Sequence, residues 1–437
     1  MLRSFVRSAG LWALSAISVF TVADSGWAQG IAVQGVGPVN RSMAGASTAA
    51  PIDAAGAIHW NPATISGLPH NEVTFGLELL LPDETLFSTL GPASGSTDAE
   101  SGVAPIPTVA WVQHAEDERL TYGLGMFGVA GYRANYPASL TNPISTPQSN
   151  TPGVPGGLGR IFSELEVLQI VPTVSFAVTD RLSIGFAPTV SLARIGAQPL
   201  FLVEPDDADG SGQPRYPDGL GNRYHWGFGG QLGIYYIADG GWHWGASIKS
   251  PQWFEEFRFM TTDEIGGPRL ETVNIDYPMI LSLGVAYSGI ERWVIAVDAR
   301  YFDYKNTDGF RTTGFRPDFA SVLGLGWNNI FSVSTGVQYE YSERLTLRGG
   351  YTYQQVPFSS SRTIFNVASP LIIEHVASVG ASYQWNRHVA FNVAYVHGFE
   401  NSVTGPIEQP TTGPIPGSSV TSRVAAYALS VGATVRY

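Results

Sequence analysis

The residue pattern closest to a chemical motif is the glycine-rich hexapeptide Gly123-Leu124-Gly125-Met126-Phe127-Gly128. Its glycine spacing is that of dinucleotide-binding loops, in which a following helix points its N-terminus at the pyrophosphate. Here the hexapeptide lies inside a segment with strand alternation, and no helical pattern follows it. The sequence therefore predicts no nucleotide site, and no cofactor is expected.

Other candidate groups for metal binding or catalysis lack a complete pattern. Asp206-Asp207-Ala208-Asp209-Gly210 resembles part of a calcium loop, but its spacing is incomplete and no glutamate occupies the last ligand position. We interpret it as a solvated acidic loop, with a divalent ion held at the lipopolysaccharide surface as the alternative. The histidines show no paired metal spacing, and neither HExxH nor GxSxG occurs. No metal site and no enzymatic activity are therefore predicted.

The amino-acid composition indicates the kind of fold in which these residues lie. The chain has 437 residues, of which 24 are basic and 36 acidic, so its formal net charge is −12. Only 14% are charged, 12% are aromatic, 50 are glycine and none is cysteine. An acidic chain with only two lysines is a poor nucleic-acid binder, and without cysteine there is no thiolate nucleophile. The chain has few charges and many aromatic residues, and after residue 25 no apolar window is long enough for a membrane-spanning helix. These features favour a transmembrane β-barrel.

The first residues have the pattern of an export signal. Arg3 and Arg7 form a positive start, residues 9–23 form an apolar stretch, and small residues precede a cleavage position after Ala28. About 15 apolar residues are too few to span a bilayer comfortably. We therefore predict a signal peptide over residues 1–28 and export to the outer membrane of a diderm, Gram-negative-type bacterium.

Alternating apolar and polar residues predict the barrel strands. Over the last dozen or so residues, every second residue up to Tyr437 is apolar and the residues between are mostly small or polar. Successive strand side chains point to opposite faces, so one face is apolar and the other is not. A soluble β-sandwich also alternates. Here the polar faces carry Gly, Ser, Thr and Gln rather than the Lys and Glu of a water-facing sheet, and aromatics gather near segment ends.

The alternation gives fourteen candidate strands whose connections alternate in length. The segments are 71–81, 104–114, 119–130, 161–179, 181–197, 223–237, 242–260, 270–288, 292–305, 328–342, 344–357, 371–386, 388–401 and 422–437. Short periplasmic turns opposite long external loops are typical of outer-membrane barrels. We therefore predict an all-β fold, a 14-stranded antiparallel transmembrane β-barrel over residues 71–437.

Residues 29–70 do not follow this pattern. They are rich in Gly, Ala and Ser, with Gly35, Gly37 and Gly45 followed by Asn61-Pro62-Ala63, and they predict a compact, turn-rich segment with short helical pieces. A barrel of fourteen strands has a lumen too wide for its own side chains to fill. We predict that this segment is an N-terminal hatch, or plug, inside the lumen, with a periplasmic linker as the alternative.

This segment resembles that of a known family. Gly35-Val36-Gly37, Met43-Ala44-Gly45-Ala46-Ser47, Asp53-Ala54-Ala55 and Asn61-Pro62-Ala63, followed by a strand, are similar to the N-terminal hatch of FadL-type transporters. The motif-level resemblance covers residues 30–81. It implies a fourteen-stranded barrel with a hatch, a kinked third strand that opens laterally into the membrane, and transport of long-chain fatty acids or other hydrophobic compounds. It does not fix the substrate, because members differ between fatty acids and aromatic hydrocarbons.

The third predicted strand shows a change of phase of its own. Apolar residues occupy even positions from Leu120 to Met126 and then odd positions at Phe127 and Val129. One inserted residue, a β-bulge, produces such a slip, and Gly128 weakens the strand further. We predict a lateral-opening kink at Met126, Phe127 and Gly128, with an ordinary rim bulge as the alternative.

Charged residues on the polar faces and the terminal aromatic have separate predicted roles. The inward charges predict a lumen hydrogen-bonding network that braces the hatch, formed by Lys249, Asp298, Arg300, Glu340, Arg348 and Arg436. Tyr437 ends the lipid face of the last strand, a recurrent feature of outer-membrane barrels. We predict that it is an assembly signal read by the barrel insertion machinery.

Together these features predict passive uptake of hydrophobic molecules, either long-chain fatty acids or aromatic hydrocarbons. The apolar run Pro199-Leu200-Phe201-Leu202-Val203 would capture the ligand, the lumen would bind it and the third strand would release it sideways. The expected partners are this hydrophobic ligand, outer-membrane lipid and lipopolysaccharide, and the insertion machinery, but no nucleic acid. A water-filled porin for small polar solutes and an outer-membrane barrel hydrolase are the alternatives.

Overall fold

The computed structural model describes residues 29–117, 119–149, 156–220, 223–316, 321–410 and 412–437. The predicted signal peptide, residues 1–28, lies outside the described residues. Within these ranges no helix has the length and apolar character needed to cross a membrane.

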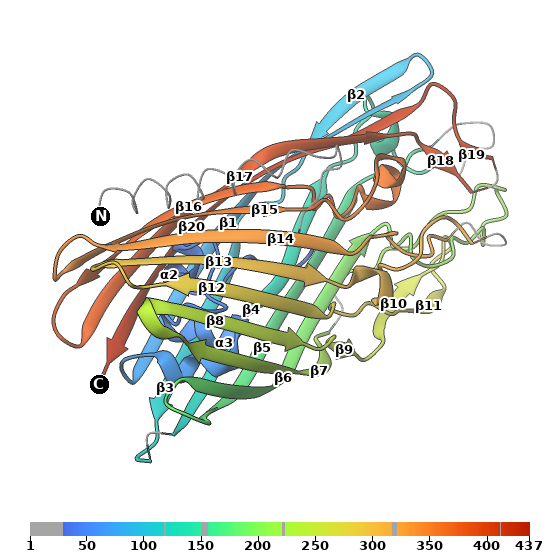
Figure 1. Ribbon diagram of the computed structural model, residues 1–437. Coiled ribbons are helices and arrows are strands. Elements are labelled where there is room, and N and C mark those ends of the chain that lie inside the picture. The colour runs from blue at the N-terminus through green and yellow to red at the C-terminus, as the bar shows by residue number, and fades with distance from the viewer. Residues whose placement is uncertain (1–28, 118, 150–155, 221–222, 317–320, 411) are drawn as a thin grey trace.

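Fourteen antiparallel strands of the described chain close into a barrel, as the sequence predicted (Figure 1). They are β1 (Glu72–Leu90), β3 (Ala104–His114), β4 (Leu120–Tyr136), β5 (Ile161–Ala177), β6 (Leu182–Gln198), β7 (His225–Ile237), β8 (Trp242–Lys249), β12 (Ile280–Tyr287), β13 (Trp293–Phe302), β14 (Ile330–Glu340), β15 (Leu345–Gln354), β16 (His375–Gln384), β17 (Val389–Gly405) and β20 (Ser419–Arg436). Strands adjacent in this order pair with each other, and β1 pairs with β20 from Glu72–Arg436 to Thr89–Ser419. The first strand therefore meets the last, and the sheet closes on itself.

Shorter elements extend the sheet or lie in the connections. They are β2 (Ala93–Asp98), β9 (Trp253–Phe254), β10 (Phe257–Thr262), β11 (Pro268–Val273), β18 (Glu408–Gln409), β19 (Gly413–Pro414), η2 (Pro143–Ser145), η3 (Asp239–Gly241), η4 (Tyr304–Asn306) and η5 (Ser360–Asn366). β2 forms a hairpin with the outer part of β1, and β10 pairs with β11. β10, β11, β18 and β19 lie at the end of the barrel opposite the C-terminus (Figure 1). The long connections mark this end as the outer one.

Two predicted strands are shorter than the sequence indicated. In the segments 242–260 and 270–288, β8 and β12 are the long wall strands. The two-residue strand β9 adds to β7, and β10 and β11 form a separate hairpin. Pro251 and Pro278 lie at the breaks, because a proline cannot donate a hydrogen bond to the sheet. By contrast, β1 and β4 continue well beyond their predicted ends.

The outer face of the barrel is apolar. On β20, Leu429 and Val431 are 44% and 47% exposed, whereas Ser430 between them is fully buried. On the paired strand β1, Phe75 and Leu77 are exposed in the same way. Rows of large apolar side chains on the outside of a closed sheet are stable in lipid rather than in water.

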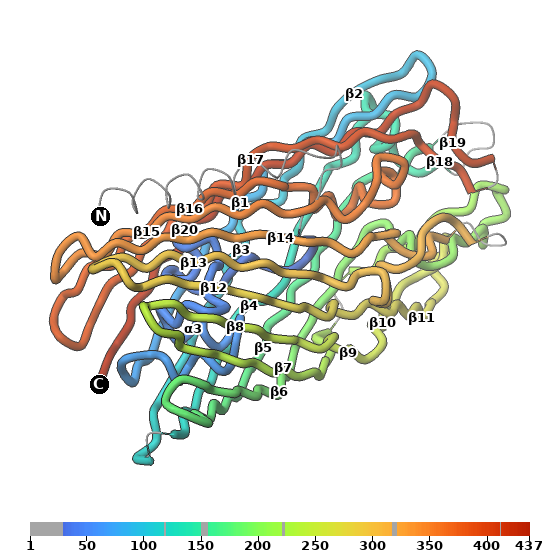
Figure 2. The backbone as a smooth tube through the Cα atoms, viewed as in Figure 1, coloured from blue at the N-terminus to red at the C-terminus, as the bar shows by residue number. Residues whose placement is uncertain are grey.

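Residues 29–70, which we call the inner segment, lie largely within the barrel (Figures 1 and 2). They contain α2 (Gly37–Ser42), α3 (Ala54–Trp60) and η1 (Pro62–Gly67). The three helices contact β1, β3 to β7, β15 to β17 and β20. The loop between α2 and α3 contacts β8, β12, β13 and β14. The inner segment therefore touches all fourteen described barrel strands.

Inward-facing glycines make room for the inner segment. An added Cβ at Gly233 would lie 2.0 Å from Asn61 Oδ1, and one at Gly245 would lie 1.9 Å from Thr48 O. A similar close approach to the inner segment recurs at Gly185, Gly284, Gly336, Gly350 and Gly380. At these positions the wall approaches the inner segment to a distance that a side chain would prevent.

We expect Tyr437 to contribute to closure of the barrel. Trp111 Nε1 on β3 donates to Tyr437 Oη at 2.7 Å, and Tyr437 N donates to Asn71 O at 3.1 Å, so the last residue bonds to residues flanking and neighbouring β1. Deletion of Tyr437 should lower the heat-modifiable folded fraction in membranes severalfold. Tyr437→Phe, which keeps the ring at the membrane interface, should retain most of it. Wild-type folded yield from the deletion would leave Tyr437 as an ordinary interfacial aromatic.

Candidate functional site

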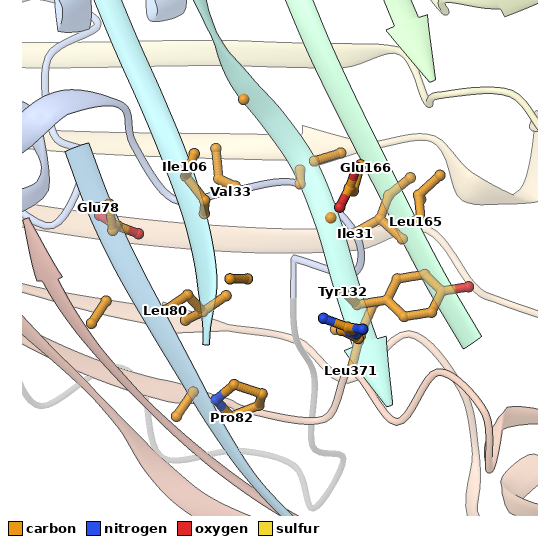
Figure 3. A pocket seen from close by; sticks show the side chains of 18 of the residues that line it. Ile31, Val33, Glu78, Leu80, Pro82, Ile106, Tyr132, Leu165, Glu166 and Leu371 are labelled. Carbon is orange, nitrogen blue, oxygen red and sulfur yellow. The ribbon is translucent and has the colours of Figure 1, made fainter. Parts of the chain in front are cut away.

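A cavity of about 700 Å³ lies between the inner segment and the barrel wall. Its lining is mostly apolar and comes from several strands as well as from the inner segment, as Figure 3 shows for Ile31, Val33, Leu80, Pro82, Ile106, Leu165 and Leu371. A largely apolar cavity of this size fits a small hydrophobic molecule.

The cavity continues through the wall between β3 and β4. These strands pair from Thr108–Phe127 to His114–Thr121. Beyond this stretch, residues 104–107 of β3 pair with β1 and residues 128–136 of β4 pair with β5, but not with each other. The lining includes residues from both sides of this break, together with Leu168 and Leu192 on the outward faces of β5 and β6. The cavity is therefore lined from the lumen and from the membrane-facing side.

A register shift in β4 accompanies the break. The pairing of β4 with β5 shifts between Gly128 and Ala130, which leaves Val129 as an extra residue. Before the shift the odd-numbered residues of β4 are buried, whereas Ala134 and Tyr136 are buried after it. A β-bulge changes the side-chain phase of a strand in this way.

The predicted kink residues lie just before the extra residue. Met126 is 39% exposed on the membrane side, Phe127 is fully buried, and Gly128 borders the shift. The Phe127 ring packs edge-on against His59 of α3 at a centroid distance of 5.4 Å. The apolar Phe127 therefore reflects contact with the inner segment, and the change of phase comes slightly later than the sequence placed it.

The first residues of the inner segment pair with the edge of β4 that β3 leaves free. Val33 N donates to Val129 O at 3.0 Å, Gly131 N donates to Ile31 O at 3.2 Å, and Ala32 forms a bridge with β4. Unpaired backbone groups are costly at membrane depth. This pairing therefore stabilises the break from inside.

A buried ion pair fixes the inner segment to β13. Arg300 Nη2 donates to Asp298 Oδ2 at 2.6 Å, and both side chains are fully buried. The same carboxylate oxygen accepts from Ser47 N at 2.8 Å and Thr48 N at 2.9 Å. Arg300 also donates to Gly45 O at 2.6 Å, and its guanidinium lies 3.5 Å from the centroid of the Trp60 ring. The pair therefore bonds directly to the loop between α2 and α3.

The other predicted network residues are not hydrogen-bonded to this pair. Lys249 is buried, but its Nζ has no hydrogen-bond partner among the described residues, and Glu340 is exposed. Arg348 donates to Gln338 and Ser382, whereas Arg436 donates to Gln384 and lies 3.7 Å from Glu72. The predicted single network is therefore divided, because alternation identifies inward charges without giving their height along the barrel axis.

Carboxylates on β1 that the sequence analysis did not single out also hold the inner segment. Arg41 of α2 donates to both oxygens of Glu78, at 2.6 and 2.8 Å, and Ala54 N donates to Glu72 Oε1 at 2.7 Å. Asp53 caps α3, and burial raises the pKa of this carboxyl to about 7, with a smaller contribution from Glu72. The sequence could have identified Glu72 and Glu78 by their even-numbered positions, which lie on the polar face of the predicted strand 71–81.

The predicted hatch residues lie at tight turns and caps of the inner segment. Gly45 has a φ of +79°, and an added Cβ would lie 1.7 Å from Gln34 O. Asn61 Oδ1 accepts from Ala63 N at 3.1 Å, and Asn61 Nδ2 donates to Ile234 O of β7 at 2.9 Å. The other predicted residues, Gly35, Gly37 and Pro62, are buried in the same segment.

The hydrolase alternative requires a serine beside a histidine. His243 Nε2 lies 2.9 Å from Ser288 Oγ, and His243 Nδ1 lies 2.8 Å from Tyr235 Oη. This pair lies at the short-turn end of the barrel. Its third group is a tyrosine hydroxyl rather than the carboxylate that orients the histidine of serine hydrolases. The arrangement therefore gives the hydrolase alternative little support.

The fold and the cavity together define a class of protein. A closed barrel with an apolar outer face, a segment that occupies its lumen and an apolar cavity that reaches through the wall are the features of an outer-membrane transport barrel. The chain belongs to the outer membrane protein transport protein family (OMPP1/FadL/TodX), whose family model matches residues 19–437. This membership confirms the predicted family and the predicted location in the outer membrane.

Individual relatives agree with this assignment at low sequence identity. The chain is 20% identical over 413 residues to a long-chain fatty acid transport protein of Salmonella typhi, covering 88% of this chain and 91% of the relative. The structure of the Pseudomonas putida toluene transporter TodX matches with a TM-score of 0.67 and 18% identity, covering 93% of this chain and 99% of that one. The Ralstonia pickettii toluene transporter TbuX matches with a TM-score of 0.65 and 20% identity, with the same coverage. At this identity the structural matches establish the fold.

We expect Asp298→Asn to loosen the inner segment without unfolding the barrel. The substitution leaves Arg300 buried without its counter-charge, which costs about 3–5 kcal/mol when a buried pair is broken. Protease cleavage within residues 29–70 and single-channel ion conductance in planar bilayers should both rise severalfold. Glu340→Gln, at an exposed charge on the neighbouring strand, is the control and should change neither. Unchanged conductance and cleavage in Asp298→Asn would show that the pair does not hold the segment.

Proposed function

We propose that the protein takes up small hydrophobic molecules by passive diffusion, with binding in the cavity and sideways release into the membrane between β3 and β4. The observation that carries this proposal is a cavity lined from the lumen and from the lipid side of the same break. The transport of toluene or fatty acids named for the relatives supports a hydrophobic ligand. No catalytic step is needed, because an apolar molecule gains about 2.5 kcal/mol per 100 Å² of surface kept from water.

In this proposal the inner segment is the hatch. It contacts every described barrel strand, so it obstructs an aqueous path through a lumen too wide for the wall's own side chains to fill. A water-filled porin would need that path open. Swelling of protein-containing liposomes in small sugars separates the two functions, since a porin admits the sugars and the proposed transporter does not.

The route from cavity to membrane passes residues 31–33. Ile31 and Val33 line the cavity while their backbone bonds to β4 (Figure 3). A ligand in the cavity therefore contacts the apolar side chains of the strand-like segment that covers the break. A small displacement of this segment would widen the passage, at the cost of two backbone hydrogen bonds of about 1 kcal/mol each.

The charges of the lining favour an uncharged ligand. The lining contains the arginines Arg41 and Arg133 and the glutamates Glu78, Glu84, Glu164 and Glu166. Both arginines have a carboxylate partner, Arg41 at 2.6 Å and Arg133 at 3.9 Å. Arg194 of β6 also pairs with Glu164 and Glu166, at 3.2 and 3.3 Å. A carboxylate ligand would therefore meet no arginine in this group that lacks a carboxylate partner. On this ground we propose aromatic hydrocarbons, rather than fatty-acid anions, as the substrate class.

We expect a disulfide across the break to stop release. An added Cβ at Gly128 lies 4.0 Å from Ile106 Cβ, within the range of about 3.5–4.5 Å that disulfides need. In this cysteine-free chain, Ile106→Cys with Gly128→Cys can form only that intramolecular bond. Oxidation should lower toluene uptake by cells at least tenfold, and reduction should restore it.

A second disulfide on the same two strands controls for cross-linking itself. Val109→Cys with Met126→Cys joins residues that already pair, so uptake should stay near the wild-type level when this bond forms. Full uptake by the oxidised Ile106–Gly128 variant would overturn lateral release. It would leave the uptake of hydrophobic molecules, and therefore the general function, intact.

We expect toluene to bind more tightly than benzoate, an anion of similar size. Benzoate would lose its hydration without gaining an unpaired cation, which should weaken its binding at least tenfold, about 1.4 kcal/mol. Displacement of a hydrophobic fluorophore from the detergent-solubilised protein near neutral pH measures the ratio. Glu166→Gln should lower the ratio of toluene affinity to benzoate affinity. Equal affinities would contradict the preference for an uncharged ligand.

A further inference from the structure

A second group of chemistry-bearing residues lies in the outer connections, away from the charged pairs of the cavity. Asp207 and Asp209 belong to the connection between β6 and β7, and Glu264 belongs to the turn between β10 and β11. One carboxylate oxygen from each of the three residues lies within 4.8 Å of the others. Two connections more than fifty residues apart in sequence therefore place like charges close to one another.

Glu264 has an oxygen available for a ligand. Its side chain is only 3% exposed, and its Oε1 accepts from Arg215 Nε at 2.6 Å. Its Oε2 is buried and has no hydrogen-bond partner among the described residues. A buried carboxylate oxygen without a partner is costly, and a cation beside it removes that cost.

The connection that carries the two aspartates has the shape of a calcium-binding turn. Asp207 Oδ1 accepts from Gly212 N at 3.0 Å, and Asp209 Oδ1 accepts from Ser211 N at 2.9 Å. Gly212 has a φ of +74°. Asp207, Asp209, Ser211 and Gly212 thus take the spacing of positions 1, 3, 5 and 6 of an EF-hand loop, where position 6 is glycine. Position 12 of such a loop is Asp218, whose Oδ2 accepts from Gln198 Nε2 at 2.9 Å. Glu264 of another hairpin supplies the third carboxylate near the two aspartates.

The neighbouring charges leave the group strongly negative. Arg269 pairs with Asp206 at 2.6 Å and with Glu271 at 2.5 Å, and Arg215 pairs with Glu264. With Asp207 and Asp209, the described cluster has five carboxylates and two guanidinium groups, a formal charge of −3. A divalent cation is the counter-charge that brings this cluster closest to balance.

We propose that Asp207, Asp209 and Glu264 bind one Ca²⁺, with the Ser211 hydroxyl and water completing the oxygen ligands. Ca²⁺ accepts several carboxylates in irregular geometry, whereas Mg²⁺ requires near-ideal octahedral ligands. The ion ties the β6–β7 connection to the β10–β11 hairpin. Leu200 and Val203 of the same connection are buried in the hydrophobic cluster that contains Phe257 and Phe259 of β10. Ca²⁺ therefore joins two connections that already share a hydrophobic cluster.

Calcium titration of the full mature protein in detergent tests this site. After treatment with a chelator, isothermal titration with CaCl₂ should give one site per chain, with a Kd of roughly 10⁻⁴–10⁻³ M or tighter, as in extracellular modules. Asp209→Asn and Asp207→Asn should each weaken binding at least tenfold while heat-modifiable folding stays normal. Glu408→Gln, in the connection between β17 and β20, is the matched control and should bind like the wild type.

Three results would overturn the proposal. They are no saturable binding by the wild-type protein, equal binding by Asp209→Asn, and Mg²⁺ binding as tight as Ca²⁺ binding. Loss of Ca²⁺ binding in both aspartate variants with retention in Glu408→Gln would support it. Uptake of the hydrophobic ligand is measured separately, so failure of the calcium site leaves the transport function untouched.

Discussion

The ion pair between Asp298 and Arg300 is the interaction on which the rest of the structure depends. Two buried charges in a barrel wall are costly unless they pair with each other and accept or donate further hydrogen bonds. Here the partners include the backbone N–H groups of Ser47 and Thr48 and the carbonyl of Gly45, all in the inner segment. The hydrogen bonds that stabilise these wall charges therefore also hold the inner segment in place.

The position of the inner segment determines what the third barrel strand can do. Val129 is an extra residue in β4, and beyond it β4 no longer pairs with β3. In lipid such an edge needs other partners, and the backbone of Ile31 and Val33 provides them. The break in the wall and the start of the inner segment are therefore one feature. Ile31 and Val33, whose backbone completes the edge, also contribute apolar side chains to the cavity.

Sequence periodicity predicted the strand count because the lipid face must be apolar along every strand, whatever the loops do. Periodicity misplaced the change of face where an apolar residue contacts the inner segment instead of lipid. Phe127 contacts His59 inside the barrel, so its position mimicked a change of face. Contacts between segments distant in sequence were also hidden, such as Arg41 of α2 with Glu78 of β1 and the approach of Asp207 to Glu264 in the outer connections. Alternation gives the side of a strand on which a residue lies, but not its height along the barrel.

The pairing of β1 with β20 has a consequence for the order of assembly. β20 is the last strand of the chain, and it meets β1 along all of its 18 residues. The wall is therefore complete only when the final residues of the chain are in place. α2 of the inner segment contacts both β1 and β20. The inner segment therefore has its full set of contacts only when the two ends of the sheet have met.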